Sequence, residues 1–160
     1  MSIAVFPGSF DPVTLGHMDV LRRAARLFEH VYVCAMVNGE KHGTFTPEQR
    51  LALLRASTQE LENVTAELWT GLLADYARAR GANTLVKGVR NGTDFAAEQG
   101  LYLINQGLCP GLDTVLFCAD APYLHYSSTM VREMIKYGQP LERFMPAAAA
   151  ELVKGWNNDG

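Results

Sequence analysis

The segment spanning residues 7–17 combines residue types that suit a bound phosphate. It reads Pro-Gly-Ser-Phe-Asp-Pro-Val-Thr-Leu-Gly-His and lies between a short apolar run and a stretch with helical periodicity. A helix start offers free backbone N–H groups and the positive end of the helix dipole to an anion. Gly8 and Gly16 let the backbone approach a ligand closely, and His17 can donate a hydrogen bond to a phosphoryl oxygen. Because an imidazolium is disfavoured beside a helix N-terminus, we expect His17 to be a neutral donor.

Three other segments carry cationic or hydroxyl side chains. Lys41 and Lys87, two of only four lysines in the chain, follow apolar runs, and Tyr126-Ser127-Ser128-Thr129 leads into another helical stretch. Ligands of open α/β sheets bind beyond the carboxyl ends of the strands, where such loops converge. The pattern therefore predicts a locally basic site for an anionic ligand.

Alternating strands and helices must position these loops. Strands are expected at 3–6, 31–37, 64–69, 84–86 and 114–118, and helices from about 14, from Pro47 after the capping residue Thr46, and at 72–80, 94–106, 128–137 and 146–156. Parallel strands need right-handed helical crossovers. We therefore predict one α/β domain over residues 1–160, with a doubly wound, Rossmann-like sheet of five mostly parallel strands and helices on both faces. The first helix is expected to pack these side chains on the sheet: Val20, Leu21, Ala24, Leu27 and Phe28.

Composition limits the function classes. The chain has 160 residues, a formal net charge of −3 and 48% hydrophobic residues. Without a global basic field, neither nucleic acid nor a membrane is an expected partner, and no segment resembles a signal peptide or a membrane span. No metal-ligand spacing is present. A cytoplasmic protein with reduced core thiols is expected from three separated cysteines in apolar runs, Cys34, Cys109 and Cys118.

Four segments together resemble a known family. Thr14-Leu15-Gly16-His17 matches the (His or Thr)-x-Gly-His hallmark of a nucleotidyltransferase superfamily. "EKHGTFTPEQRLALL", "LVKGVRNGTDFAAE" and "YSSTMVREMIKYG" follow in the order and at the spacing of bacterial phosphopantetheine adenylyltransferases. The resemblance covers nearly the whole chain, whereas the first motif alone would indicate only the superfamily.

The resemblance implies transfer of AMP from ATP to 4′-phosphopantetheine, a step of coenzyme A biosynthesis, by direct in-line attack of the acceptor phosphate. An anionic acceptor oxygen needs no strong general base, so positioning and charge stabilisation can suffice. The implied catalytic residues are His17 and Lys41, and the implied acceptor-binding residues are Ser9, Lys41, Leu73 and Lys87. The implied ATP-binding residues are Ser9, Phe10, His17, Gly88, Val89, Arg90, Glu98, Tyr123, Leu124, His125, Tyr126, Ser127, Ser128 and Thr129.

The resemblance also implies a magnesium ion and a homohexamer. Because the sequence has no acidic cluster to cage a metal, Mg²⁺ is expected to be held mainly by ATP phosphates and water. Lys87 replaces an arginine that is common in the family, so a point charge stands in place of a bidentate fork. Ala96, Ala97 and residues 126–129 also depart from the usual pattern and affect the expected adenine pocket.

Several alternatives stay open from the residues alone. The first motif also fits nicotinate-mononucleotide adenylyltransferases and small cytidylyltransferases, and the same fold could serve a non-catalytic nucleotide sensor. The Gly-Ser-Phe-Asp-Pro run alone fits a plain turn, and Glu98 and Arg132 alone fit solvated helix faces. A dinucleotide oxidoreductase and a P-loop enzyme are disfavoured because their glycine motifs are missing.

Overall fold

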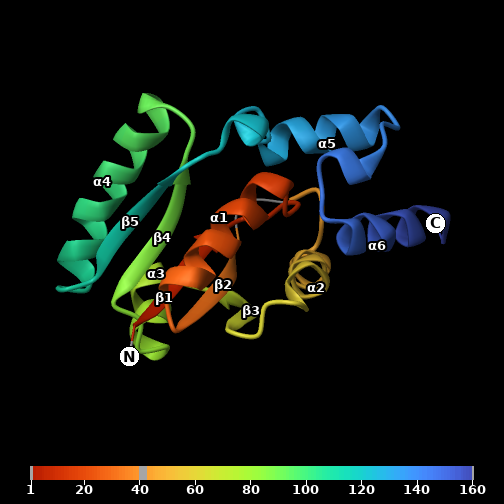
Figure 1. The fold of residues 1–160 in the computed structure, drawn as a ribbon. Helices are drawn as coiled ribbons and strands as arrows, with labels where there is room; N and C mark the ends of the chain where they lie inside the picture. Colours follow the sequence, from red (N-terminus) through yellow and green to blue (C-terminus); the bar gives the residue numbers. More distant parts are fainter. Residues whose placement is uncertain (1, 40–42, 160) are drawn as a thin grey trace.

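Five parallel strands form one sheet in the computed structural model, which describes residues 2–39 and 43–159 (Figure 1). The strands are β1 (Ile3–Gly8), β2 (His30–Val37), β3 (Val64–Thr70), β4 (Thr84–Val89) and β5 (Asp113–Cys118). Their order is β3-β2-β1-β4-β5, and every neighbouring pair is parallel. The predicted fold class is confirmed. β4 continues to Val89 instead of ending at Val86, because its last residues still pair with β5.

In the described part of the chain, six α-helices alternate with or follow the strands: α1 (Leu15–Leu27), α2 (Pro47–Thr58), α3 (Leu73–Ala79), α4 (Gly92–Leu108), α5 (Ser128–Lys136) and α6 (Ala147–Asn158). Capping boxes start α1 at Thr14 and α2 at Thr46. α4 begins earlier than expected, because the Asn91 side chain accepts a hydrogen bond from the Asp94 backbone N–H. None of the helices within the described residues has the length and hydropathy that a membrane crossing requires.

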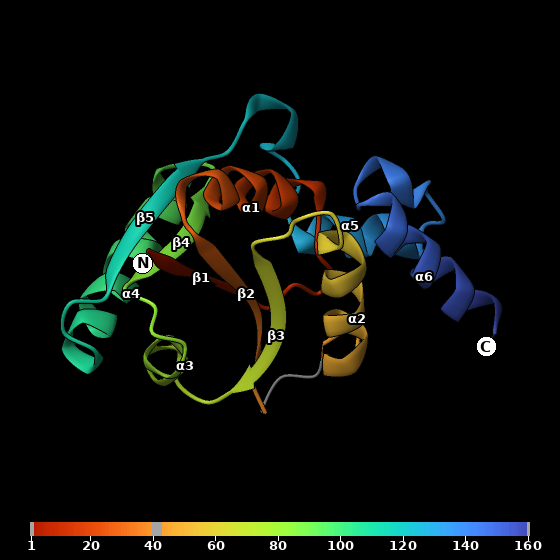
Figure 2. The same cartoon turned by 60° about the horizontal axis from the view of Figure 1, so that its bottom comes forward.

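The helices cover both faces of the sheet. α1 and α2 pack on one face, and α3 and α4 lie on the other (Figure 2). α6 packs against α2, and α5 and α6 lie together at the side of the domain where β3 and α2 are found (Figures 1 and 2). From β1 the chain adds β2 and β3 on one side of the sheet, and then β4 and β5 on the other side of β1. The order of the strands therefore reverses between β1 and β4, and a ligand site is expected at the carboxyl ends of these two strands.

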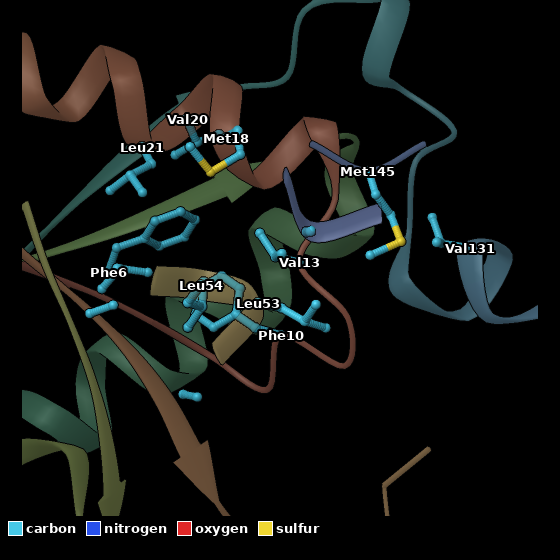
Figure 3. Packing of buried hydrophobic residues seen from close by; sticks show 14 of the residues in the cluster. Phe6, Phe10, Val13, Met18, Val20, Leu21, Leu53, Leu54, Val131 and Met145 are labelled. Carbon is cyan, nitrogen blue, oxygen red and sulfur yellow. The ribbon is translucent and has the colours of Figure 1, made fainter. Parts of the chain in front are cut away.

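The larger core cluster includes the turn that leads from β1 to α1. Phe10 and Val13 from this turn are 2% and 0% exposed, and they lie among side chains of α1 and α2 (Figure 3). Val131 of α5 and Met145 belong to the same cluster. The turn is therefore anchored in the core, which restricts how its polar residues can move.

Two expectations about the core are wrong. Leu27 is 66% exposed, because it is the last residue of α1 and the extended residue Phe28 packs against the core in its place. Of the three cysteines, which are all free, Cys34 is buried, Cys109 is half-buried and Cys118 is exposed. Cys118 ends the edge strand β5, where a second neighbouring strand is not available to cover it.

Candidate active site

The start of α1 fixes the orientation of His17. Thr14, the capping residue, is fully buried, and its Oγ1 accepts a hydrogen bond from the His17 backbone N–H at 3.2 Å. In return, the Thr14 backbone N–H donates to Nδ1 of the His17 ring at 3.0 Å. A neutral imidazole has one accepting and one donating nitrogen. Because Nδ1 accepts, the proton is on Nε2, and His17 has a single defined donor for a ligand.

The His17 ring is neutral at physiological pH. Burial, followed by the positive charge of Arg90, lowers its pKa to about 4. The sequence indicated a neutral ring from the helix N-terminus, whereas burial is the first cause in the structure. The ring packs edge-on against Phe10, with 4.9 Å between ring centroids. His17 thus combines a fixed ring, a known tautomer and an uncharged N–H donor.

Phe10 contacts this ring, and its backbone has a conformation that residues other than glycine rarely adopt. Its φ is 46°, in the left-handed region, which costs a non-glycine residue about 1 kcal/mol or more. The Phe10 ring makes edge contacts with Phe6 and His17 at centroid distances of 5.4 and 4.9 Å. A Cβ at Gly8 would lie 3.1 Å from the Phe10 ring, so a larger residue there would require the ring to shift by a few tenths of an ångström. At Gly16 a Cβ would meet only ordinary contacts at 3.5–3.6 Å.

A cavity of about 320 Å³ opens at the carboxyl ends of β1 and β4. It lies at the reversal point of the sheet, where a ligand site was expected. Its lining comes from the end of β1, the first turns of α1, the end of β4, the first turns of α4 and the segment 119–128. Three of the predicted segments, those at 7–17, at Lys87 and at 126–129, therefore meet around one space.

Many of the predicted site residues line this cavity: Phe10, His17, Lys87, Gly88, Arg90, Glu98, Tyr123, Tyr126, Ser127 and Ser128. Four others adjoin these along the chain without lining it: Val89, Leu124, His125 and Thr129. Ser9 lines a second cavity, of about 340 Å³, together with Asp11 and two arginines. Leu73 begins α3 and packs beside the smaller core cluster. Lys41 falls outside the described residues.

The charged side chains of the first cavity are paired. Lys87 Nζ lies 3.1 Å from Glu98 Oε2, and Arg90 Nε donates to Asp94 Oδ2 at 3.1 Å. Burial acts to raise the pKa of Asp94, but hydrogen bonds from Arg90 and its charge outweigh burial and lower it. The expected basic focus is therefore balanced by carboxylates among the described lining residues. To bind an anion, Lys87 or Arg90 would have to replace its contact with a carboxylate by a contact with the ligand. The helix starts would supply the other contacts.

The start of α5 supplies hydroxyls to the same cavity. Ser127 caps the helix, and its Oγ accepts from the Met130 backbone N–H at 3.1 Å. Ser128 Oγ donates to the Pro12 carbonyl at 2.9 Å, which joins α5 to the turn after β1. Thr129 is exposed, and its Oγ1 accepts a hydrogen bond from Arg132 Nη2. Ser127 and the start of α5 therefore lie at the cavity, and a helix start is a favourable place for an anion.

Comparisons with known proteins place the chain in a family. A sequence profile of the Cytidylyltransferase-like family matches residues 5–134. A phosphopantetheine adenylyltransferase of Levilactobacillus brevis is 41% identical over 153 residues, which cover 96% of this chain and 95% of the relative. That of Chloroflexus aggregans is 42% identical over 153 residues and covers 95% of both chains. The chain belongs to the phosphopantetheine adenylyltransferase family.

A more distant protein has the same fold as this member of the phosphopantetheine adenylyltransferase family. The structure of a bifunctional NMN adenylyltransferase/ADP ribose pyrophosphatase from Francisella tularensis, in complex with AMP and a manganese ion, matches with a TM-score of 0.71 at 16% identity. The match covers 98% of this chain and 49% of that one. At this identity the likeness concerns the fold.

Sequence reasoning missed some lining residues of the family site. Asp94 and Val20 line the cavity, and neither was predicted there. Val20 is three residues beyond His17 on the same face of α1, so helical spacing could have found it once His17 was chosen. Asp94 pairs with Arg90, which precedes α4, so that pair depends on the backbone between β4 and α4 and helical spacing does not indicate it.

Proposed function

We propose that this protein transfers AMP from ATP to the phosphate of 4′-phosphopantetheine, giving dephospho-coenzyme A and pyrophosphate. The observation that carries the proposal is the neutral, oriented His17 ring on the cavity at the reversal point of the sheet. A donor with a defined N–H and no charge of its own suits a phosphoryl oxygen that gains charge in the transition state. Relatives of the same length at 41–42% identity favour phosphopantetheine over the alternative acceptors.

In the proposed reaction an acceptor phosphate oxygen attacks the α-phosphorus of ATP. The new bond joins this oxygen to the α-phosphorus, the bond to the β-phosphate oxygen breaks, and pyrophosphate leaves. His17 Nε2–H donates to an α-phosphate oxygen and does not release its proton. Because the acceptor oxygen is already anionic, orientation and charge stabilisation account for the catalysis.

The charged residues have different proposed partners. Lys87, with Ser9 and Lys41, binds the acceptor phosphate, so Lys87 exchanges part of its contact with Glu98 for the ligand. Arg90, Ser127 and the start of α5 bind the phosphates of ATP. Support comes from the cavity, which brings Lys87, Arg90 and Ser127 around one space.

Magnesium is proposed to enter with ATP. Among residues 2–39 and 43–159, His, Cys, Asp and Glu side chains form no group of three that could hold a metal. The two cavity carboxylates, Asp94 and Glu98, each face a cation. This donor set fits a metal that is held mainly by phosphate oxygens and water. When bound, the ion neutralises phosphate charge.

A homo-oligomer is proposed from the surface of α4, with a hexamer as the form that the family resemblance implies. α4 has no buried residue and exposes these large apolar side chains: Phe95, Leu101, Leu103, Ile104 and Leu108. A monomer rarely leaves so many large apolar side chains of one helix in water. Light scattering should give a mass above that of one chain, and Leu103→Asp should lower it. Leu27→Asp, at an equally exposed leucine of α1, is the matched control.

A cytoplasmic location is also proposed. The three cysteines are free, which suits a reducing compartment. Partners other than ATP and 4′-phosphopantetheine, such as nucleic acid or a membrane, are not proposed for a chain of net charge −3.

The test of the function is pyrophosphate release from ATP and Mg²⁺ with three acceptors: phosphopantetheine, nicotinate mononucleotide and glycerol phosphate. Release should require phosphopantetheine, and His17→Ala should lower turnover about a hundredfold or more, as for loss of one preorganised donor. Release with another acceptor would overturn the substrate. ATP binding without release would favour a nucleotide sensor.

A further inference from the structure

The turn between β1 and α1 presents its carbonyl groups to two distant helices. Arg50 Nη1, from α2, donates to the Ser9 carbonyl at 3.0 Å. Arg132 Nη1, from α5, donates to the Asp11 carbonyl at 2.7 Å. With Ser128 on the Pro12 carbonyl, three carbonyls of one short turn are held by side chains from elsewhere in the chain.

The Asp11 side chain adds a further attachment. Its Oδ1 accepts from the Phe45 backbone N–H at 2.8 Å, and its Oδ2 accepts from the Thr44 backbone N–H at 2.9 Å. Arg132 Nη1 lies 4.0 Å from the same Oδ2. A Cβ at Gly43 would come within 2.7 Å of Asp11 Oδ2, so glycine permits this close approach. The turn, α5 and the segment before α2 are thus tied at one carboxylate.

This turn needs outside support because of Phe10. A left-handed φ of 46° at a non-glycine residue persists only where the surroundings determine the backbone. Phe10 packs against the His17 ring, and Ser9 precedes it. The backbone of residues 9–12 therefore decides both how His17 is supported and where Ser9 lies.

Arg50 is a charged residue at a buried position. It is only 6% exposed, and within the described residues its Nε has no hydrogen-bond partner. Burying a guanidinium is costly unless its hydrogen bonds compensate. The bond to Ser9 is directed at the turn of the proposed active site, which gives the buried charge a function there.

We propose that Arg50 and Arg132 are positioning residues for adenylyl transfer. They hold the turn at residues 9–12 so that Ser9 meets the acceptor phosphate and Phe10 supports His17. Arg132 also donates to Thr129 Oγ1 at 3.1 Å, so it joins the turn to the start of α5. The inference rests on the proposed function.

The experiment compares Arg50→Met and Arg132→Met with controls on the same helices, Arg55→Met and Lys136→Met, at exposed positions. Hydrogen exchange in peptides covering residues 8–16 should be about tenfold faster in the two test variants, because each loses a hydrogen bond from a charged donor. The KM for phosphopantetheine should rise about tenfold. Arg50→Lys should restore part of both effects, since an ammonium can donate to one carbonyl.

Unchanged exchange in the turn would overturn the proposal. Faster exchange with a KM within twofold of the wild type would show a merely structural role, because partial unfolding lowers kcat and leaves the KM unchanged. If Arg50→Met does not fold, Arg50→Lys and Arg132→Met carry the same comparison. Failure of the proposed function is distinct: the wild type would not use phosphopantetheine, whereas exchange needs no substrate.

Discussion

Lys87 Nζ lies 3.1 Å from Glu98 Oε2, and the two side chains are only 19% and 17% exposed. The pair joins the end of β4 to α4 within the cavity. Sequence resemblance assigns Lys87 to the acceptor and Glu98 to ATP, so the ion pair connects the two proposed half-sites. Its low exposure means that solvent screens it less than a surface pair.

Removing the Lys87 charge should weaken acceptor binding. We expect Lys87→Met to raise the KM for phosphopantetheine tenfold or more, because a lost charge-assisted hydrogen bond costs about 1.5–3 kcal/mol. Lys87→Arg should retain a low KM, because the forked guanidinium can donate to both Glu98 and a phosphate. Steady-state kinetics check this, with Lys154→Met, at an exposed lysine of α6, as the control. A KM unchanged in Lys87→Met would remove this lysine from the acceptor site.

The two capping boxes allow a matched test of His17 placement. Thr14→Val and Thr46→Val each remove a hydroxyl that caps a helix, at α1 and α2 respectively. Each should lower the free energy of unfolding by about 1 kcal/mol. Only Thr14→Val should also lower kcat, by about threefold or more, because the Thr14 hydroxyl accepts the hydrogen bond that holds the His17 backbone at the start of α1. Urea unfolding and turnover measure the two effects, and equal kcat values for both variants would contradict the link.

The pH dependence of stability should carry a contribution from His17. Its pKa is about 4 in the folded protein and about 6.5 when exposed, so between these values the unfolded chain binds the extra proton. Stability should therefore fall as the pH drops from 6.5 to 4, by about 3 kcal/mol at most, and be unaffected above 6.5. Urea unfolding at several pH values should show this slope in the wild type and a smaller one in His17→Gln. The same slope in both proteins would be evidence against the lowered pKa.

Local sequence signals predicted much of the fold. Apolar runs bounded by glycine and polar residues located all five strands, and the Thr46-Pro47-Gln49 pattern placed the start of α2 at Pro47. These features depend on neighbours in sequence, which periodicity and capping describe well. The start of α4 was placed too late, because the capping role of Asn91 was not recognised.

Contacts between distant residues could not be predicted in this way. The sequence alone placed Arg132 on a solvated helix face, and nothing indicated that its guanidinium reaches the Asp11 carbonyl. The pairing of Lys87 with Glu98 was also missed, since each was assigned to a separate ligand. Such pairs depend on how the helices pack on the sheet. The types of residue that surround His17 were therefore predictable from the sequence, and the contacts that support them were not.

Cys118 and Cys34 should react with thiol reagents at rates set by burial. Cys34 is fully buried, and burial raises its pKa to about 12, while Cys118 is exposed at the end of β5. Because the thiolate is the reactive form, a thiol reagent at neutral pH should modify Cys118 quickly and Cys34 only on unfolding. Time-resolved labelling with mass spectrometry checks the order, with Cys118→Ser as the control that loses the fast phase. Rapid labelling of Cys34 in the folded protein would mean that the face of the sheet covered by α3 opens readily, against its packing beneath Tyr76.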